Sequence, residues 1–264
     1  MPASTDATTS ERPWALITGA TGGIGAEFAR YLAQHGSNLV LTGRNTVKLG
    51  DIATEVAGFG AQSILLPVDL VDRAARTRMV DELTGEGVHI STLVNNAGYG
   101  LVNDLHETDV DDLLDMVEVN TAALTHLTRL LLPAMLEAKQ GSIINVASTA
   151  SYQPIPSMGA YAASKAYVRS LSLALWHETR GTGVRVVCIN PGPTETGFFT
   201  RAGNNNVLRR RRSPEDVVET TFKALNANRP TAIDGVMNQA TAMANRFVPE
   251  SVSTALAKVF IHHT

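Results

Sequence analysis

Six short apolar segments recur along the first 190 residues, and longer segments with helical periodicity separate them. Most of the short segments hold consecutive apolar residues rather than an alternation of apolar and polar ones, which is typical of parallel strands covered by helices on both faces. The expected strands are 14–18, 38–42, 63–68, 92–95, 142–146 and 184–190. The expected helices are 23–35, 46–58, 72–84, 109–138 and 158–181. This alternation predicts an α/β fold, a doubly wound parallel sheet with right-handed crossovers.

The chain has 264 residues, enough for one large α/β domain. We expect this domain over residues 13–264, after a polar, disordered leader at 1–12 that has no signal core. Pro133 should bend the 109–138 helix. Beyond residue 190 we expect a substrate loop at about 193–212, a helix starting near Ser213 and a strand near 230–233. A helical C-terminal extension at about 236–261 follows, with helices near 236–247 and 249–261.

Charge and hydropathy exclude several classes of protein. The formal net charge of −3 gives no reason to expect a nucleic acid or an anionic membrane as partner. No apolar run approaches the roughly 20 residues that span a bilayer. Cys188 is the single cysteine and lies in an apolar run, so we expect a buried thiol rather than a nucleophile. A chain without an internal disulfide is consistent with the cytoplasm, and we assign no metal ligands.

A glycine-rich segment follows the first expected strand and opens the first expected helix. It reads Thr18-Gly19-Ala20-Thr21-Gly22-Gly23-Ile24-Gly25. Glycines allow a tight turn and let backbone N–H groups approach a pyrophosphate, whose charge the helix N-terminus also favours. A glycine cluster alone is weak evidence, since many tight turns bind nothing. The strand before it and the helix after it favour a dinucleotide site.

The second expected strand ends in Thr42-Gly43-Arg44. An acidic residue here would bind the ribose 2′-hydroxyl of NAD(H) and repel a 2′-phosphate. Gly43 instead leaves space and Arg44 offers a guanidinium to a phosphate, which favours NADP(H). A solvated loop arginine is the alternative. Asp69, after the third strand, could accept a hydrogen bond from an adenine amino group or could cap the next helix.

Tyr161 and Lys165 lie four residues apart in an expected helix, so their side chains share one face. An unperturbed phenol has a pKa of about 10, and a neighbouring cation lowers it by favouring the phenolate. The spacing therefore predicts a proton-transfer pair.

These motifs together resemble the short-chain dehydrogenase/reductase family, in its compact single-domain branch. The resemblance covers about residues 14–200 and consists of Thr-Gly-(x)3-Gly-x-Gly at 18–25, Asn-Asn-Ala-Gly at 95–98, Asn120, Ser148, Tyr161-(x)3-Lys165 and Pro191-Gly192. It implies a Rossmann fold and an enzyme acting on CH–OH groups, with Tyr161 as general acid or base. Lys165 would lower the pKa of that phenol and hold the nicotinamide ribose. Ser148 would polarise the substrate oxygen, and Asn120 would help to position a water that links Lys165 to solvent.

The resemblance also implies further cofactor contacts. Asn95 is expected to be structural, whereas Ala97 and Gly98 would border the cofactor. Thr194 is preferred as a nicotinamide contact over Thr196, which could instead cap a following helix. The cofactor-binding residues that we predict are Gly19, Thr21, Gly22, Gly23, Ile24, Gly25, Arg44, Asp69, Leu70, Asn96, Ala97, Gly98, Tyr161, Lys165, Pro191, Gly192 and Thr194.

Apolar residues are expected over the substrate, which favours a lipophilic ketone or aldehyde. They are Tyr152, Pro154, Ile155 and Met158, with Phe198 and Phe199 at the pocket mouth. The arginine run at 209–212 could meet an anionic acyl thioester carrying phosphopantetheine, but a solvated helix flank is the preferred interpretation.

We therefore expect an NADP(H)-dependent oxidoreductase that interconverts a small-molecule carbonyl and its alcohol. A 3-oxoacyl thioester reductase and a non-catalytic, NADP-sensing binding protein are the alternatives. The resemblance implies a homodimer contact through the helices at 109–138 and 158–181, with a homotetramer as the alternative. The apolar spacing of the C-terminal extension would suit a cover over the pocket or a contact with a membrane surface.

Overall fold

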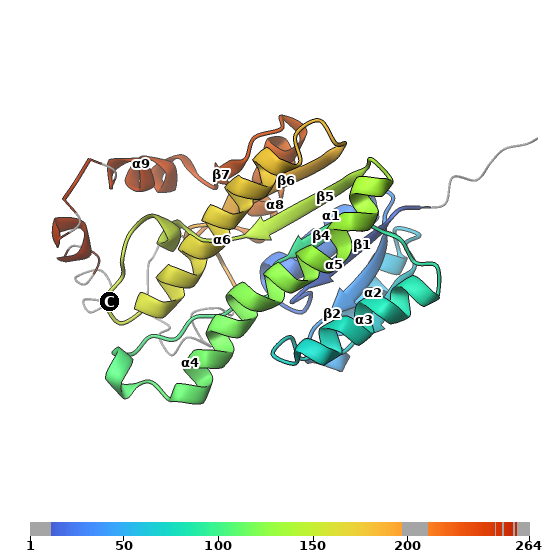
Figure 1. The fold of residues 1–264 in the computed structure, drawn as a ribbon, viewed down its shortest axis with the longest axis horizontal. Coiled ribbons are helices and arrows are strands. Elements are labelled where there is room, and N and C mark those ends of the chain that lie inside the picture. Colours follow the sequence, from blue (N-terminus) through green and yellow to red (C-terminus); the bar gives the residue numbers. More distant parts are fainter. Residues whose placement is uncertain (1–11, 197–210, 246, 250, 256, 258–264) are drawn as a thin grey trace, which may run out of the picture.

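The computed structural model describes residues 12–196, 211–245, 247–249, 251–255 and 257. Its centre is a seven-stranded sheet in the order β3-β2-β1-β4-β5-β6-β7, with every pairing parallel (Figure 1). The strands are β1 (Trp14–Thr18), β2 (Asn38–Thr42), β3 (Ser63–Leu66), β4 (Ile90–Asn95), β5 (Gly141–Val146), β6 (Val184–Asn190) and β7 (Thr231–Ile233). The predicted doubly wound parallel sheet is confirmed.

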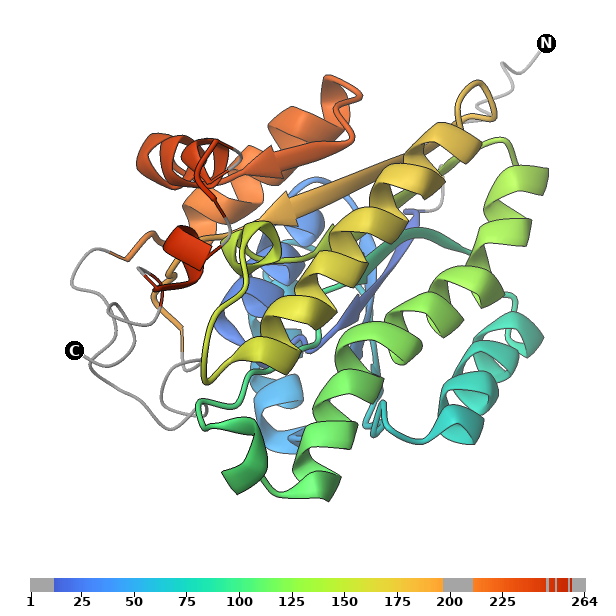
Figure 2. The ribbon, with the colours of Figure 1, turned by 60° about the vertical axis from the view of Figure 1, so that its left-hand side comes forward.

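Helices cover both faces of this sheet. The α-helices of the described residues are α1 (Gly23–Gln34), α2 (Thr46–Ala57), α3 (Arg73–Gly85), α4 (Val110–Val117), α5 (Leu124–Glu137), α6 (Gly159–Glu178), α8 (Pro214–Asn226) and α9 (Val236–Ala244). Short 3-10 turns are η1 (Leu105–Glu107) and η3 (Thr149–Tyr152), and η2 (Glu118–Ala123) is a π-helical turn. Figure 2 shows α3, α5 and α6 side by side in front of the sheet.

Most strands carry consecutive apolar residues because each face of the sheet has its own core. In β1, Ala15 and Ile17 pack with α1, α2 and α8, whereas Leu16 packs with α3, α5 and α6. Successive side chains of a strand point to opposite faces, so a strand covered on both sides has no polar alternation.

The sheet order reverses at β1, which pairs with β2 on one side and β4 on the other. The turns after β1 and β4 therefore lead away in opposite directions and leave a crevice at the carboxyl ends of the strands, where ligands bind in open α/β sheets. The glycine-rich segment follows β1 and the 95–98 segment follows β4.

The predicted 109–138 helix is not one regular α-helix. It is divided into α4, η2 and α5, and Pro133 lies inside α5. The helix is thus interrupted by the π-turn at 118–123, which holds Asn120, and the side chain of Asn120 binds Tyr99 and Ser164 outside this segment. Other boundaries differ by a few residues: β3 ends at Leu66, β4 begins at Ile90 and α6 ends at Glu178.

The two ends of the chain are described in part. Residues 1–11, most of the predicted leader, lie outside the described residues, while Arg12 donates a hydrogen bond to the Phe59 carbonyl at 3.2 Å. The extension contains α9, shorter than predicted, and helical residues at 251–255. In the described part of the chain, no helix combines the length and apolarity needed to cross a bilayer.

Candidate active site

A cavity of about 850 Å³ lies at the crevice where the sheet order reverses. Every cofactor-binding residue predicted from the sequence lines it, as does Ser148. Segments far apart in the chain meet here because the carboxyl ends of parallel strands share one edge of the sheet.

The glycine-rich segment is held by its close approach to the turn after β4. Gly19 has φ +63°, and a Cβ there would lie 2.9 Å from the Cα of Ala97. The side-chain amide of Asn96 donates to the carbonyls of Thr18 and Gly19 at 3.0 and 3.1 Å. A Cβ on Gly25 would overlap with the Gly19 carbonyl, so only glycine fits.

The N-terminus of α1 opens on this cavity, and its N-cap residue, Gly22, provides no side-chain cap. The first N–H groups of a helix have no partners within the helix and carry a partial positive charge. This arrangement fits a pyrophosphate, and hence a dinucleotide.

Arg44 follows β2, is exposed and lines the cavity together with Gly43. Asp69 also lines this region, and its carboxylate accepts a hydrogen bond from the Val71 N–H at 3.1 Å. The alternative that Asp69 caps the next helix is wrong, because Asp72 is the N-cap of α3 and accepts from the Ala75 N–H.

Ser148 and Tyr161 bring two hydroxyl groups together on the cavity wall. Ser148 follows β5 and caps η3, where its side chain accepts from the Ala150 N–H at 3.1 Å. Tyr161 projects from the first turn of α6, is 7% exposed and is hydrogen-bonded to the Ser148 side chain. A carbonyl oxygen placed between two such hydroxyls would be polarised and within reach of a proton.

The predicted lowering of the Tyr161 pKa is wrong for this structure. Burial raises the pKa of Tyr161 to about 12, and the hydrogen bond with Ser148 opposes this rise only in part. The Lys165 ammonium lies 5.8 Å from the centroid of the phenol ring and donates to the Val146 carbonyl at 2.9 Å. Loss of solvent is therefore the main cause of the raised pKa of Tyr161.

Lys165 is itself only 4% exposed, and burial lowers its pKa to about 8, while the neighbouring Cys188 opposes this change. Cys188 is buried, as predicted, and burial raises its pKa to about 11. At neutral pH the phenol keeps its proton and the lysine is largely charged.

Asn120 is the one predicted catalytic residue that does not line the cavity. It is 1% exposed in the π-turn η2, behind Gly98. Its carbonyl oxygen accepts from the Tyr99 N–H at 3.1 Å, and its amide donates to the Tyr99 carbonyl and the Ser164 hydroxyl, both at 3.0 Å. Because a Cβ on Gly98 would lie 2.8 Å from the Asn120 oxygen and 3.0 Å from the Lys165 nitrogen, both polar groups flank this glycine.

Asn95 does not face the cavity either. It is buried, and its amide donates to Asn145 at 2.9 Å and to Thr128 at 3.1 Å, which ties β4 to β5 and α5. This contact agrees with the structural role expected for Asn95.

The apolar wall near Tyr161 was predicted in part. Ile155 and Met158 line the cavity, but Tyr152 and Pro154 do not, and Tyr152 instead lines a second cavity. Tyr152 stacks under the guanidinium of Arg169 at 4.3 Å, which turns it away from Tyr161. The wall also contains Leu101 and Ala150, which no sequence motif marked.

Helix α9 covers part of the cavity. Asn238, Thr241, Ala242 and Asn245 line it, and the Asn245 amide donates to the Gln153 side chain at 2.6 Å. Asn238 covers Gly192, where a Cβ would overlap with its amide. Of the two uses considered for the extension, covering the pocket agrees with these contacts. The sequence carried no signal for these polar residues, because they belong to no motif and the pattern there is set by apolar residues at helical spacing.

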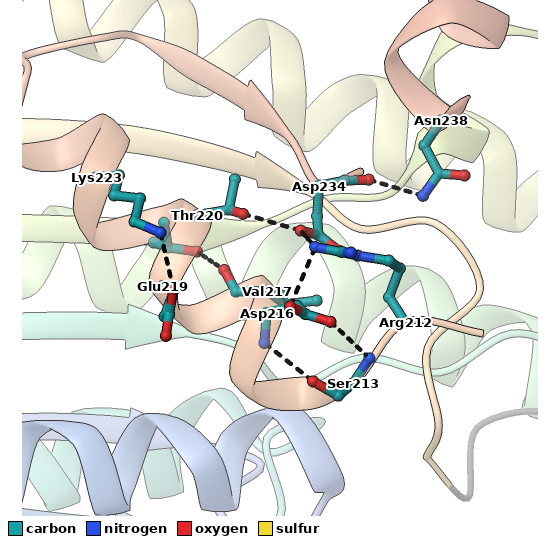
Figure 3. Close-up of polar contacts among 10 residues, drawn as sticks. Arg212, Ser213, Asp216, Val217, Glu219, Thr220, Lys223, Asp234 and Asn238 are labelled. Carbon is teal, nitrogen blue, oxygen red and sulfur yellow. Dashed lines mark hydrogen bonds and ion pairs between the residues drawn. The ribbon is translucent and has the colours of Figure 1, made fainter. Parts of the chain in front are cut away.

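Arg212 at the end of the substrate loop binds protein side chains. Its guanidinium donates to both carboxylate oxygens of Asp234, at 2.9 and 3.0 Å (Figure 3). It is therefore not a free anion receptor. Its side chain is 41% exposed and also pairs with Asp216 of α8, which agrees with the preferred interpretation of a helix flank. Phe198, Phe199, Arg209 and Arg210 lie outside the described residues. Thr194 and Thr196 both line the cavity, and the helix that Thr196 could cap also lies outside the described residues.

Comparison with known proteins places this site among related enzymes. Residues 13–206 match the family model for short chain dehydrogenases. An NADP-dependent 3-hydroxy acid dehydrogenase from Escherichia coli strain K12 is 38% identical over 178 residues, which are 67% of this chain and 71% of the relative.

Solved structures agree. A short-chain dehydrogenase from Sphingobium yanoikuyae in complex with NADPH has a TM-score of 0.82 and 28% identity, covering 91% of this chain and 94% of the other. A bulky-bulky ketone specific alcohol dehydrogenase from Comamonas testosteroni has a TM-score of 0.77 and 25% identity, covering 92% and 97%. The chain belongs to the short-chain dehydrogenase/reductase family and is an oxidoreductase of that family.

Proposed function

We propose that this protein is an NADP(H)-dependent oxidoreductase that interconverts a hydrophobic ketone or aldehyde and its alcohol. The observation that carries the proposal is the hydrogen-bonded pair of Ser148 and Tyr161, which shares one cavity with Lys165 and with the glycine-rich segment. A proton donor and a dinucleotide cradle in the same cavity are the two requirements of carbonyl reduction by hydride transfer.

The cofactor is assigned from its cradle. The pyrophosphate would lie at the N-terminus of α1, over Gly19, Gly22 and Gly23, and the nicotinamide end would lie near Gly192 and Thr194. Bound there, the dinucleotide supplies the hydride. Arg44 and Gly43 favour NADP(H), since a guanidinium at this position pairs with a 2′-phosphate. An NADP-dependent relative and a neighbour solved with NADPH support this choice.

The protein's own side chains manage the proton. Because burial raises the pKa of Tyr161 to about 12, the phenol holds its proton at neutral pH and is poised to donate it to a carbonyl oxygen. Ser148 holds the same oxygen by a second hydrogen bond. The charged Lys165 would stabilise the phenolate that remains after this proton transfer.

The substrate class follows from the wall near Tyr161. Leu101, Ala150, Ile155 and Met158 surround this part of the cavity, and a lipophilic carbonyl compound fits them better than a sugar. The neighbour specific for bulky ketones supports this class. A 3-oxoacyl thioester reductase is less favoured. Its substrate would carry an anionic phosphopantetheine, and Arg212, one of the four arginines that could bind this group, pairs with Asp234 instead.

Assembly and location belong to the same proposal. Val110 and Leu114 of α4 and Tyr167 of α6 are exposed, at 65%, 60% and 44%, which favours a homodimer through these helices. The homotetramer remains the alternative. We also propose that the protein is cytoplasmic, which its single cysteine supports.

The test is the Tyr161→Phe variant. It should lose NADPH oxidation by more than about a hundredfold with a panel of ketones, aldehydes and acyl thioesters, since general acid catalysis contributes about 10²–10⁴-fold. NADPH binding, followed by its fluorescence, should stay close to that of the wild type. A variant that turns over like the wild type would contradict the assigned chemistry. Wild type that binds NADPH but reduces no compound would favour the sensor protein.

A further inference from the structure

A second cavity, of about 500 Å³, lies along a neighbouring face of α9 to the one that lines the candidate active site. It is formed by Tyr152 of η3, Arg169 of α6, the carboxyl half of α8, β7 and the side of α9 that carries Gln239 and Met243. Figure 1 shows α9 next to β7 at this end of the sheet. The volume is in the range that accommodates small organic ligands.

The charges of this cavity have one sign. Among the described residues that line it are Arg169, Lys223 and Arg229, and no aspartate or glutamate. Lys223 is engaged, because its ammonium binds Glu219 at 2.8 Å (Figure 3). The two arginines therefore carry the available charge.

Neither arginine has an acidic partner within the described part of the chain. The buried Nε of Arg169 has no hydrogen-bond partner at all there, and its guanidinium is held only by the Tyr152 ring at 4.3 Å. A buried donor without a partner costs about 1–3 kcal/mol, which an acceptor in the cavity would recover. Stacking on an aromatic face leaves the edge of a guanidinium free to bind an anion.

The rest of the lining is mainly apolar and includes Ala224, Ile233, Ala242 and Met243. Inorganic phosphate would gain nothing from such walls, whereas an aliphatic chain would lose water-exposed surface there. The cavity thus combines two cationic donors with room for an apolar body.

We propose that this cavity is a second ligand site, which binds the carboxylate of a medium-length aliphatic acid between Arg169 and Arg229. The site does not depend on the proposed function. It is separate from the cofactor cavity, although Ala242 of α9 lies in the wall between them and lines both.

The test measures binding of octanoate by isothermal titration calorimetry. Octanamide has the same apolar body without the charge, and inorganic phosphate has charge without the body. Octanoate should bind saturably, and octanamide should bind at least about tenfold more weakly, because a hydrogen bond to a charged group is worth about 1.5–3 kcal/mol.

Two variants locate the site. Arg169→Gln and Arg229→Gln should each weaken octanoate by about tenfold or more. Arg229 is exposed, so its variant keeps the test decisive if Arg169→Gln does not fold. Arg180→Gln is the matched control, since Arg180 stacks on Trp176 at 5.3 Å and lines neither cavity.

Three outcomes would overturn the proposal. If octanoate does not bind, or if phosphate binds as tightly as octanoate, the cavity is not a site for an aliphatic acid. If both arginine variants bind octanoate with the same affinity as the wild type, the binding site lies elsewhere, for example in the catalytic cavity.

Discussion

Arg212 and Asp234 form a two-pronged ion pair that joins the end of the substrate loop to the start of α9. The Asp234 carboxylate is fully buried and also accepts from Thr220 of α8, while its backbone carbonyl accepts from Asn238 at 2.7 Å (Figure 3). Backbone bonds from Arg212 N–H to Pro193 and from Glu195 N–H to Arg212 close the loop stem, both at 2.9 Å. One buried carboxylate thus fixes the turn at Pro193 and Thr194, which line the cavity.

The Arg212→Gln substitution should therefore destabilise the protein. It leaves a buried carboxylate without its cation, which costs about 3 kcal/mol in the free energy of unfolding. Urea denaturation gives this quantity. Lys223→Gln is the control, because its pair with Glu219 lies on the surface and its loss should have no measurable effect. Equal stabilities of the wild type and Arg212→Gln would show that the pair is not a stabilising link.

Arg44→Ala tests the choice of cofactor. Loss of a charge-assisted bond to the 2′-phosphate should weaken NADPH by about 10–100-fold and leave NADH nearly unchanged. Cofactor titrations monitored by fluorescence give both dissociation constants. Lys48→Ala, an exposed cation of α2 outside the cavity, should change neither. Equal losses for the two cofactors would argue against a phosphate clamp.

Gly98→Ala should impair catalysis without unfolding the protein. Its new methyl group would press on the Asn120 oxygen and the Lys165 nitrogen, which must move by several tenths of an ångström. We expect kcat to fall by at least about tenfold, with a stability loss of about 1–3 kcal/mol from overpacking. Gly50→Ala is the control: it lies inside α2 with open space around it and should stabilise the protein by about 0.5–1 kcal/mol. A Gly98→Ala enzyme with unchanged kcat would mean that this contact is not used.

The lowered pKa of the buried Lys165 should make the free energy of unfolding depend on pH. Its pKa is lowered to about 8 in the folded protein, so between about 8 and 10.5 the unfolded chain binds the proton that the folded chain has released. The stability contributed by this residue is thus fully present above the unfolded pKa and is lost as pH falls through about 8.

Comparison with Lys165→Met isolates this contribution. Both proteins carry Cys188→Ala, because the Cys188 thiol and Lys165 influence each other's pKa. Tyr161, whose raised pKa acts in the opposite sense, is present in both and cancels in the difference. The unfolding free energy of Cys188→Ala minus that of the Cys188→Ala, Lys165→Met double variant should increase between about pH 7.5 and 9.5. A difference that stays constant over this range would show that the buried lysine keeps its ordinary pKa.

The fold and the members of the candidate site were predictable because they depend on local patterns. Strands with consecutive apolar residues, such as Leu39-Val40-Leu41 in β2, require cover on both faces, and Gly19 and Gly25 allow a close backbone approach. Residues that follow strands of a parallel sheet meet at one edge whatever their separation in the chain. For this reason the motifs after β1, β4, β5 and β6 line a single cavity.

The sequence by itself determined the parallel sheet, the dinucleotide cradle and the spacing of Tyr161 and Lys165, because backbone geometry and helical period are local properties. Only the tertiary structure decided the protonation of that pair, the engagement of Arg212 by Asp234 and the cover that α9 places over the cavity. A pKa depends on how completely neighbouring segments exclude water, and the partner of a side chain depends on which distant residue packs beside it. Neither quantity is encoded in a local pattern.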